Sequence, residues 1–252
     1  MVVSVAWRHV RAFAVSGVVA LGLAGGALPA EASPPPPDRL EVFLEAGGFL
    51  APDGQSITVS VLARCPENWT VQQALVSLSQ RQASGSASFP LTCTGEFGLA
   101  FRVTVPASGS EFLLGQAEAT AVVTVKRGRT EQVNDVQTVD VDPTIVVEFG
   151  DRIARLHDGG RAVDVAVTVA CPRQTTGRPS SIGMFQGRTS GFGSFLPICD
   201  GQPHLFTVTV EASTGLYQPG NALVVPNVDV EWEGRIFNFF ANDPIQIVGQ
   251  NS

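Results

Sequence analysis

The sequence lacks the short motifs by which most enzyme families are recognised. It contains no Gly-x-Ser-x-Gly nucleophile elbow, no phosphate-binding loop and no dinucleotide fingerprint. Beyond residue 32 it has two histidines, His157 and His204, and neither stands in the spacing of a metal or catalytic site. We therefore expect a non-enzymatic protein. The alternative is an exported hydrolase of unrecognised type, in which one of these histidines would meet a serine and a carboxylate.

Basic residues and long apolar runs are also scarce. The 23 acidic residues outnumber the 16 basic ones, which gives a formal net charge of −7, and lysine occurs once, at Lys126. An acidic surface disfavours nucleic acid and anionic membranes as partners. Beyond the N-terminal segment, no apolar run approaches the roughly 20 residues that a membrane-spanning helix needs. No membrane span is expected in the mature chain.

The first 32 residues have the layout of a secretory signal peptide. Arg8 and Arg11 precede an apolar stretch, and Ala30-Glu31-Ala32 offers an A-x-A cleavage site. A membrane anchor is the alternative, disfavoured because the apolar stretch is short and interrupted by glycines. Residues 33–38 form a proline-rich linker, which is a stiff spacer. We predict a protein that is secreted to the extracellular space or held at the cell envelope.

Four cysteines form two pairs of equal spacing. Cys65 and Cys93 are 28 positions apart, as are Cys171 and Cys199, and the second pair repeats the first at an offset of 106. Four cysteines allow three pairings, and the duplication favours disulfides 65–93 and 171–199. The short C-x2-C spacing of zinc sites is absent. The repeat predicts two tandem domains, each with one internal disulfide, over residues 39–142 and 143–252.

Apolar and polar residues alternate with the period of a β-strand. Odd positions are apolar or small over 57–65 and again over 163–171, and no stretch of 11 residues has a helical period. Strands of the first domain are expected at 40–48, 56–65, 74–82, 86–93, 99–106, 115–127 and 130–141. This count predicts an all-β protein built from two tandem immunoglobulin-like antiparallel β-sandwiches.

Other short segments recur between the two copies. Gln80 matches Gln186, and Ser84-Gly85 matches Ser190-Gly191, where each Ser-Gly is predicted to turn a hairpin. Phe112-x-x-Gly-x-Ala recurs as Tyr217-x-x-Gly-x-Ala ahead of the penultimate strand. An aromatic residue there is similar to the tyrosine corner of Greek-key sandwiches, although Phe112 offers packing without a hydroxyl.

The pattern Cys-Pro, Gln-x-x-x-Ser-Gly, Cys-x-Gly and Phe/Tyr-x-x-Gly-x-Ala resembles exported actinobacterial proteins of uncharacterised function. Those proteins consist of similar Ig-like modules, and the resemblance covers nearly the whole mature chain. It implies an Ig-like fold and supplies no catalytic residues. The low lysine content, with abundant alanine, glycine and valine, is consistent with a high-GC bacterial genome.

The predicted domain junction gathers four carboxylates. Asp140 and Asp142 share one face of a strand, and Glu148 and Asp151 follow closely. Calcium takes six to eight oxygen ligands, so these residues are a candidate calcium site that would stiffen the junction. The alternative is a polar linker without metal, and no other cofactor is expected.

Two groups of aromatic residues are candidate contact sites. Phe237, Phe239 and Phe240 lie on a strand that is apolar on both faces, whereas its counterpart in the first copy is polar. One face of that strand is predicted to meet a protein partner or a second copy of the chain, unless it packs within the fold. Trp69 and Trp232 are candidate sugar-stacking residues of a carbohydrate-binding module, with packing anchors as the alternative.

Overall fold

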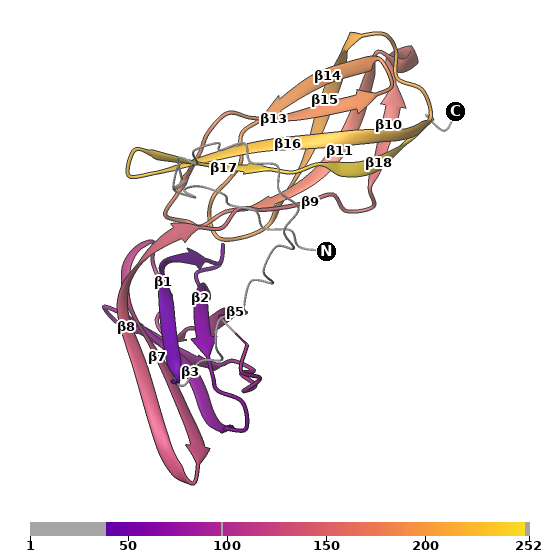
Figure 1. Ribbon diagram of the computed structural model, residues 1–252. Helices are drawn as coiled ribbons and strands as arrows, with labels where there is room; N and C mark the ends of the chain where they lie inside the picture. Colours follow the sequence, from indigo (N-terminus) through magenta and orange to yellow (C-terminus); the bar gives the residue numbers. More distant parts are fainter. Residues whose placement is uncertain (1–38, 97, 250–252) are drawn as a thin grey trace, which may run out of the picture.

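The computed structural model describes residues 39–96 and 98–249 (Figure 1). The predicted signal peptide over 1–32 and the linker over 33–38 lie outside the described residues. The first domain contains β1 (Glu41–Leu50), β2 (Ser56–Arg64), β3 (Thr70–Gln80), β4 (Ala83–Ser88), β5 (Leu99–Pro106), β6 (Ser108–Gly109), β7 (Gly115–Arg127) and β8 (Arg129–Pro143). The second contains β9 (Val146–Glu148), β10 (Ile153–His157), the 3-10 turn η1 (Asp158–Gly160), β11 (Ala162–Ala170), β12 (Thr176–Gly177), β13 (Ser180–Gln186), β14 (Thr189–Phe195), β15 (His204–Thr214), β16 (Gly220–Trp232), β17 (Arg235–Phe240) and β18 (Asp243–Val248).

The first domain is a sandwich whose two layers share β1. That strand pairs antiparallel with β2 and, over Gly47–Leu50, parallel with β8. It thereby joins the layer β5-β2-β1 to the layer β8-β7-β3-β4-β6. This is the strand order of an immunoglobulin-like domain, in which the first strand can add to either sheet. The predicted fold class is confirmed, with the parallel β1–β8 pair as a departure from purely antiparallel pairing.

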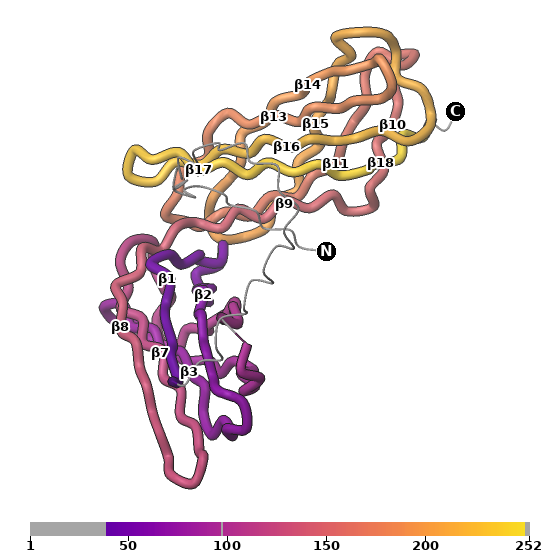
Figure 2. Tube along the Cα trace, viewed as in Figure 1, coloured from indigo at the N-terminus to yellow at the C-terminus, as the bar shows by residue number. Residues whose placement is uncertain are grey.

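The second domain repeats this arrangement and closes more completely. β10 pairs antiparallel with β11 and parallel with β18, as β1 does with β2 and β8. β14 also pairs with β15, so the ladder β10-β18-β16-β13-β14-β15-β11 returns to β10. Figure 2 shows the two domains joined end to end where β8 leads into β9. No helix in the described part of the chain is long and apolar enough to cross a membrane.

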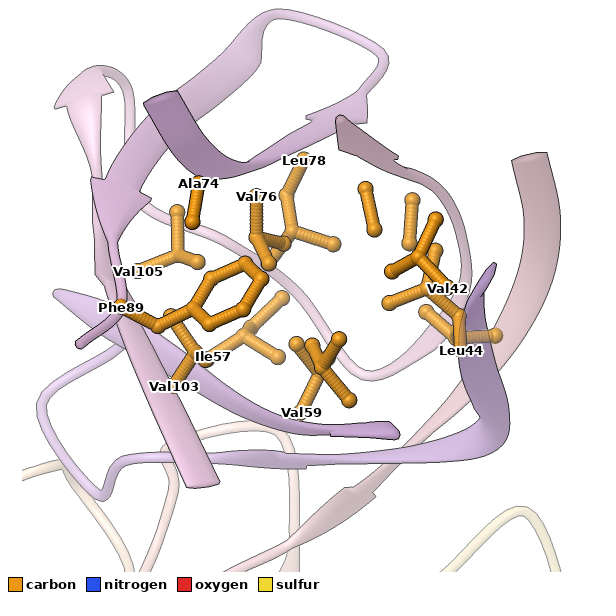
Figure 3. Packing of buried hydrophobic residues seen from close by; sticks show 14 of the residues in the cluster. Val42, Leu44, Ile57, Val59, Ala74, Val76, Leu78, Phe89, Val103 and Val105 are labelled. Atoms are coloured by element: carbon orange, nitrogen blue, oxygen red, sulfur yellow. The ribbon is translucent and has the colours of Figure 1, made fainter. Parts of the chain in front are cut away.

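Each domain has its own hydrophobic core between its layers. Along β2 the buried residues alternate strictly with half-buried ones, as the period-2 pattern predicts. Figure 3 shows Ile57, Val59, Val76, Val103 and Val105 pointing toward one another from β2, β3 and β5. Full burial of one such aliphatic side chain contributes about 1.5–3 kcal/mol, so these layers supply most of the stabilisation.

Both predicted disulfides are present, one in each domain. They join Cys65 to Cys93 and Cys171 to Cys199. Each links the end of one strand, β2 or β11, to the loop before its neighbour in the same layer, β5 or β15. The glycine two residues after the second cysteine donates its N–H to the carbonyl of the first, which explains why Cys-x-Gly recurs.

Each of the two matched glutamines, Gln80 and Gln186, holds a loop in place through side-chain hydrogen bonds. The Gln80 side chain donates to the carbonyls of Leu113 and Gln116 at 2.9 and 3.0 Å and accepts from the Leu113 N–H at 2.7 Å. Gln186 makes the equivalent three bonds to the loop before β16. Each amide therefore satisfies backbone groups of a loop that has no strand partner there.

The aromatic corner is only partly similar to a tyrosine corner. Phe112 and Tyr217 are both fully buried at the same point of their domains. The Tyr217 hydroxyl donates to the Met184 carbonyl on β13 at 3.3 Å, whereas a tyrosine corner bonds backbone a few residues upstream. Burial raises the pKa of Tyr217 to about 12.

The prediction that each Ser-Gly turns a hairpin is wrong. Gly85 and Gly191 lie within β4 and β14, and the turns fall earlier, at Arg81 in the first domain and Gly187 in the second. Arg81 adopts φ 51° without needing glycine, so β4 begins sooner than predicted. A Cβ on Gly85 would collide with the Pro106 carbonyl of β5. The glycines therefore permit β4 to approach β5 closely, and β14 to approach β15.

We predict that Gly191→Ala destabilises the second domain. The new methyl group would meet the Glu211 carbonyl and the Tyr217 hydroxyl, and neither can move without disturbing β15 or the core. Overpacking of this kind costs about 1–3 kcal/mol, measurable by guanidinium unfolding. Gly150→Ala is the matched control, because a methyl group added at Gly150 would meet nothing within 4 Å. Equal stability of the two variants would contradict the close-approach role.

Candidate functional site

In the second domain, β14, β13, β16, β17 and β18 form one layer, and its outer face carries an apolar patch. Cross-strand registers place Phe192 opposite Gly183 and Gly183 opposite Val225, and place Phe185 opposite Leu223. Residues directly opposite each other on neighbouring strands share one face of a sheet. We call the patch the aromatic face and define it as Phe185, Phe192, Leu223, Val225, Phe240 and Pro244.

The two phenyl rings at its centre lie against each other above a glycine. Phe185 and Phe192 meet edge to face with ring centroids 6.2 Å apart. A Cβ on Gly183 would lie 3.2 Å from both rings, so the glycine gives them room to settle on the sheet. The rings are nevertheless 41% and 58% exposed, and Phe240 is 56% exposed. Large apolar side chains thus stay in water although β13, β14 and β16 are fully paired.

The surroundings of the aromatic face are polar and acidic. The neighbouring outward residues along the same strands include Ser181, Ser194 and Asn227. The carboxylate of Asp229 accepts a hydrogen bond from Asn238 at 2.7 Å. Glu211, which is exposed, stands opposite Phe192 on β15. The patch is therefore an apolar centre inside a polar rim that includes two carboxylates, and an apolar centre with a polar rim is the composition expected of a protein contact surface.

The same face of the first domain is polar. The offset between the copies is 106 for Phe185, Phe192, Phe240 and Pro244 and 105 for Leu223 and Val225 on β16, as it is for Tyr217 and Phe112. The six positions of the aromatic face are accordingly occupied in the first domain by Ser79, Ser86, Glu118, Thr120, Asn134 and Thr138. The registers put these residues on the corresponding strands β3, β4, β7 and β8. Because the first domain folds with polar residues there, the aromatic face is not a requirement of the fold.

The structure divides the predicted Phe237, Phe239, Phe240 site between two faces. Phe237 and Phe239 stand opposite Val230 and Val228 and pack, half-buried, against the core of the second domain. Phe240 points outward, as does Ile236, which is 60% exposed. The outward side of β17 therefore belongs to the exposed surface, and the inward side closes the sandwich.

Sequence reasoning missed Phe185, Phe192 and Leu223. Phe192 stands between two glycines, whereas Phe185 follows Met184 and Leu223 lies in the apolar stretch 222–226, where an outward residue cannot be told from a core residue. A position-by-position comparison of the two copies would have found them, since each replaces a serine or glutamate of the first copy. Recognising the patch also requires the strand order, because β13 and β14 are distant in sequence from β16.

The two candidate sugar-stacking tryptophans pack against the core of the first domain. Trp69 is half-buried there, and its indole N–H finds no hydrogen-bond acceptor within the described residues. Trp232 belongs to the second domain yet reaches the core of the first, and its ring would lie 3.7 Å from a Cβ on Gly115. Trp232 is thus a contact between the domains.

Further contacts hold the junction. The Gln174 side chain accepts from the Leu114 N–H at 2.6 Å. Arg173 donates to Glu111 and Arg235 donates to Asp142, each at 3.3 Å. These bonds and Trp232 connect the end of the second domain to the loop before β7 and to the end of β8. The domains are therefore joined by side chains as well as by the chain itself.

The four junction carboxylates do not converge. Asp142 is bound by Arg235, and the Asp151 carboxylate accepts from the Ile153 N–H at 3.3 Å. Glu148 lines a hollow of about 430 Å³ between the domains, together with Asp53. Over residues 39–96 and 98–249, no three His, Cys, Asp or Glu side chains are grouped to hold a metal ion.

Both histidines in the described part of the chain are paired with a carboxylate. His157 Nε2 lies 3.2 Å from Asp164 Oδ1, which also accepts from the Thr209 hydroxyl at 2.7 Å. His204 Nε2 lies 2.8 Å from Asp200 Oδ1, and this hydrogen bond lowers the pKa of Asp200. In the described part of the chain, no hydrogen bond joins either histidine to a serine, as the hydrolase alternative would require.

No protein-family model matches the chain, and no curated protein matches it. Among solved structures, a conserved domain protein from Bacillus anthracis is 12% identical, with 82% of this chain and 86% of that chain covered and a TM-score of 0.29. CBD12 from CALX1.2 is 9% identical over 77% and 83% of the chains, with a TM-score of 0.26. Dpr2 Ig1-Ig2, solved in complex with DIP-Theta Ig1-Ig3, is 8% identical over 83% and 64%, with a TM-score of 0.25.

Removing the partner of Asp142 is expected to destabilise the junction in a pH-dependent way. Burial raises the pKa of Asp142 and Asp140 adds to the rise, while Arg235 opposes it. Arg235→Gln should raise the folded-state pKa further above its ordinary value of 3.8. A carboxyl group whose pKa is raised in the folded state destabilises the fold where it is ionised, so the variant loses stability as the pH rises through the raised pKa of Asp142. Below the ordinary value of 3.8 the group is protonated in both the folded and the unfolded state, and this loss disappears. The substitution should therefore lower the unfolding temperature more at about pH 7 than at about pH 3.5.

Arg129→Gln is the matched control for this measurement. It breaks an ion pair with Glu131 in which the arginine is 84% exposed, and such pairs contribute little. An equal shift at both pH values for Arg235→Gln would contradict the assigned role of Asp142.

Proposed function

We propose that the protein is a secreted, non-enzymatic binding module that holds a protein partner on the aromatic face of its second domain. The observation that carries the proposal is the difference between the two copies. One scaffold occurs twice in the chain, and the same six outward positions are apolar in one copy and polar in the other. Folding of the second domain does not explain why these positions are apolar, because a side chain that stays exposed to water contributes no hydrophobic free energy until another surface covers it.

The size of the patch sets the expected strength of binding. Six such side chains expose on the order of 400 Å² of apolar surface. Covering that area would remove apolar groups from water, which favours association. Association itself costs an estimated 4–15 kcal/mol or more, with side-chain ordering in addition. A moderate, reversible affinity therefore fits the patch.

The first domain acts as a spacer in this proposal. Its corresponding face carries serine, threonine, asparagine and glutamate, which favour contact with water. Trp232, Gln174 and Arg235 fix it against the second domain. A fixed spacer presents the aromatic face at a defined distance and angle from whatever precedes the first domain.

A binding role is better supported than the two alternatives. A carbohydrate module needs accessible aromatic rings, and Trp69 and Trp232 are half-buried against the first domain's core. A hydrolase needs a nucleophile beside a base, and His157 and His204 are each engaged by an aspartate. Export to an oxidising compartment is supported by the two disulfides.

Site-specific photo-crosslinking in the producing organism tests the proposal. A photo-reactive benzoylphenylalanine in place of Phe192 should give a covalent adduct of one defined mass on irradiation. The same group in place of Ser86, the counterpart of Phe192 in the first domain, is the matched control. Adducts in equal yield at both positions, or at neither, would refute the assignment of binding to the aromatic face.

A further inference from the structure

We infer that the hollow between the two domains is a second binding site, which takes an alkylammonium group. It is separate from the aromatic face, since none of the six residues of that face lines it. Its volume of about 430 Å³ falls within the roughly 300–1,000 Å³ of small-ligand sites, and such sites often lie where domains meet. The composition of its walls indicates the class of ligand.

Both domains contribute walls to the hollow. The turn after β1 supplies residues 51–53, and β9, β11 and the loop before β15 supply the opposite side. The two sides approach each other at one edge, where a Cβ on Gly201 would lie 3.1 Å from the Pro52 carbonyl oxygen. On the second domain, Glu148 of β9 stands opposite Thr168 of β11, so these two side chains leave the sheet on the same face. Paired strands and a tight turn therefore hold the walls in place before a ligand binds.

The charged groups of the hollow favour a cation. Asp53 and Glu148 are carboxylates, and no lysine, arginine or histidine is among the described residues that line it. The ion pairs of residues 39–96 and 98–249 do not include either carboxylate. The guanidinium of Arg173, beside Gly201, is bound to Glu111 at 3.3 Å. A hollow lined by charge of one sign concentrates ions of the opposite sign.

The remaining walls favour an organic cation over a metal ion. Pro52, Val146 and Pro203 supply apolar surface, and the two prolines have no backbone N–H to donate to an anionic group. Leu205 stands opposite Thr168 on β15 and extends this surface, although it is 70% exposed. Calcium takes about six to eight oxygen ligands and gains nothing from apolar walls, whereas an alkyl chain leaves water when it lies against them.

An alkylammonium group matches both parts of the lining. The ammonium has three N–H donors for the carboxylates of Asp53 and Glu148 and the hydroxyl of Thr168, and its chain suits the apolar walls. The same group occurs on free amines and on the lysine side chains of peptides, so the site recognises a chemistry common to both. A ligand of so few atoms, paired with exposed carboxylates, should bind with a dissociation constant on the order of 1 mM.

An amide chemical-shift titration of the isotope-labelled, disulfide-intact protein with pentylamine tests the inference. Low ionic strength is used, because salt screens exposed charges. Shifts should appear around Asp53, Glu148 and Thr168. Pentylamine should bind at least about tenfold more tightly than methylamine, since each further methylene group that leaves water strengthens binding about twofold or more. Pentanol and pentanoate, which have the same chain without the positive charge, should not shift these amides.

A lysine derivative distinguishes the two sources of the group. Equal affinity for N-acetyl-lysine methylamide and for pentylamine assigns the site to lysine side chains. Weaker binding of the lysine derivative assigns it to free amines.

Glu148→Gln removes one carboxylate charge while keeping the shape of the side chain, and it should weaken pentylamine binding at least about fivefold. Glu118→Gln, which removes the same charge from an exposed position outside the hollow, is the matched control and should bind like the wild type. The inference is overturned if pentylamine produces no shifts, if methylamine binds as tightly, or if both variants weaken binding equally. Tighter binding of calcium chloride than of pentylamine at this hollow would also overturn it. The comparison of amines uses the wild type and does not depend on the folding of a variant.

Discussion

Each domain depends on the covalent closure of one 28-residue segment. The disulfide ties the end of β2 or β11 to the loop before β5 or β15, and a complete hairpin lies between the two cysteines. Both ends of that hairpin are thereby held beside one layer of the sandwich, while its strands pair in the other. Closing a loop of this length restricts the unfolded chain and stabilises the domain by about 3–4 kcal/mol in the chain-entropy model. In the second domain this hairpin, β13–β14, carries Phe185 and Phe192.

The two copies agree on the inside and differ on the outside. The Phe89 and Phe101 rings pack in a tilted arrangement with centroids 5.2 Å apart in the first domain, and Phe195 and Phe206 do so at the same distance in the second. The disulfides, the glutamine clamps and the edge glycines recur in the same way. Packing limits what the interior accepts, whereas the outer face of a paired sheet accepts apolar or polar residues alike. The outer face is therefore where one copy could acquire a binding surface.

The β16–β17 hairpin connects that surface to the rest of the chain. Its outward side contributes Val225 and Phe240 to the aromatic face, and its inward side places Phe237 and Phe239 on the core. At the turn of this hairpin, Trp232 packs against the core of the first domain. Arg235 lies over the Phe237 ring and also donates a hydrogen bond to Asp142. One hairpin thus closes the second domain, holds the junction and borders the aromatic face.

The sequence by itself determined the fold class, the disulfide pairing and most strand positions of the first domain, although the predicted strand 86–93 lies at Ala83–Ser88. These depend on local periodicity and on a repeat that can be counted along the chain. Only the tertiary structure decided the role of Gly85, which looked like a turn residue until β5 was found against it. The same holds for the direction of Phe237, since a strand apolar on both faces does not indicate which face is buried. The aromatic face too required the strand order, because side chains from β13, β14, β16, β17 and β18 become neighbours only when the layer is assembled.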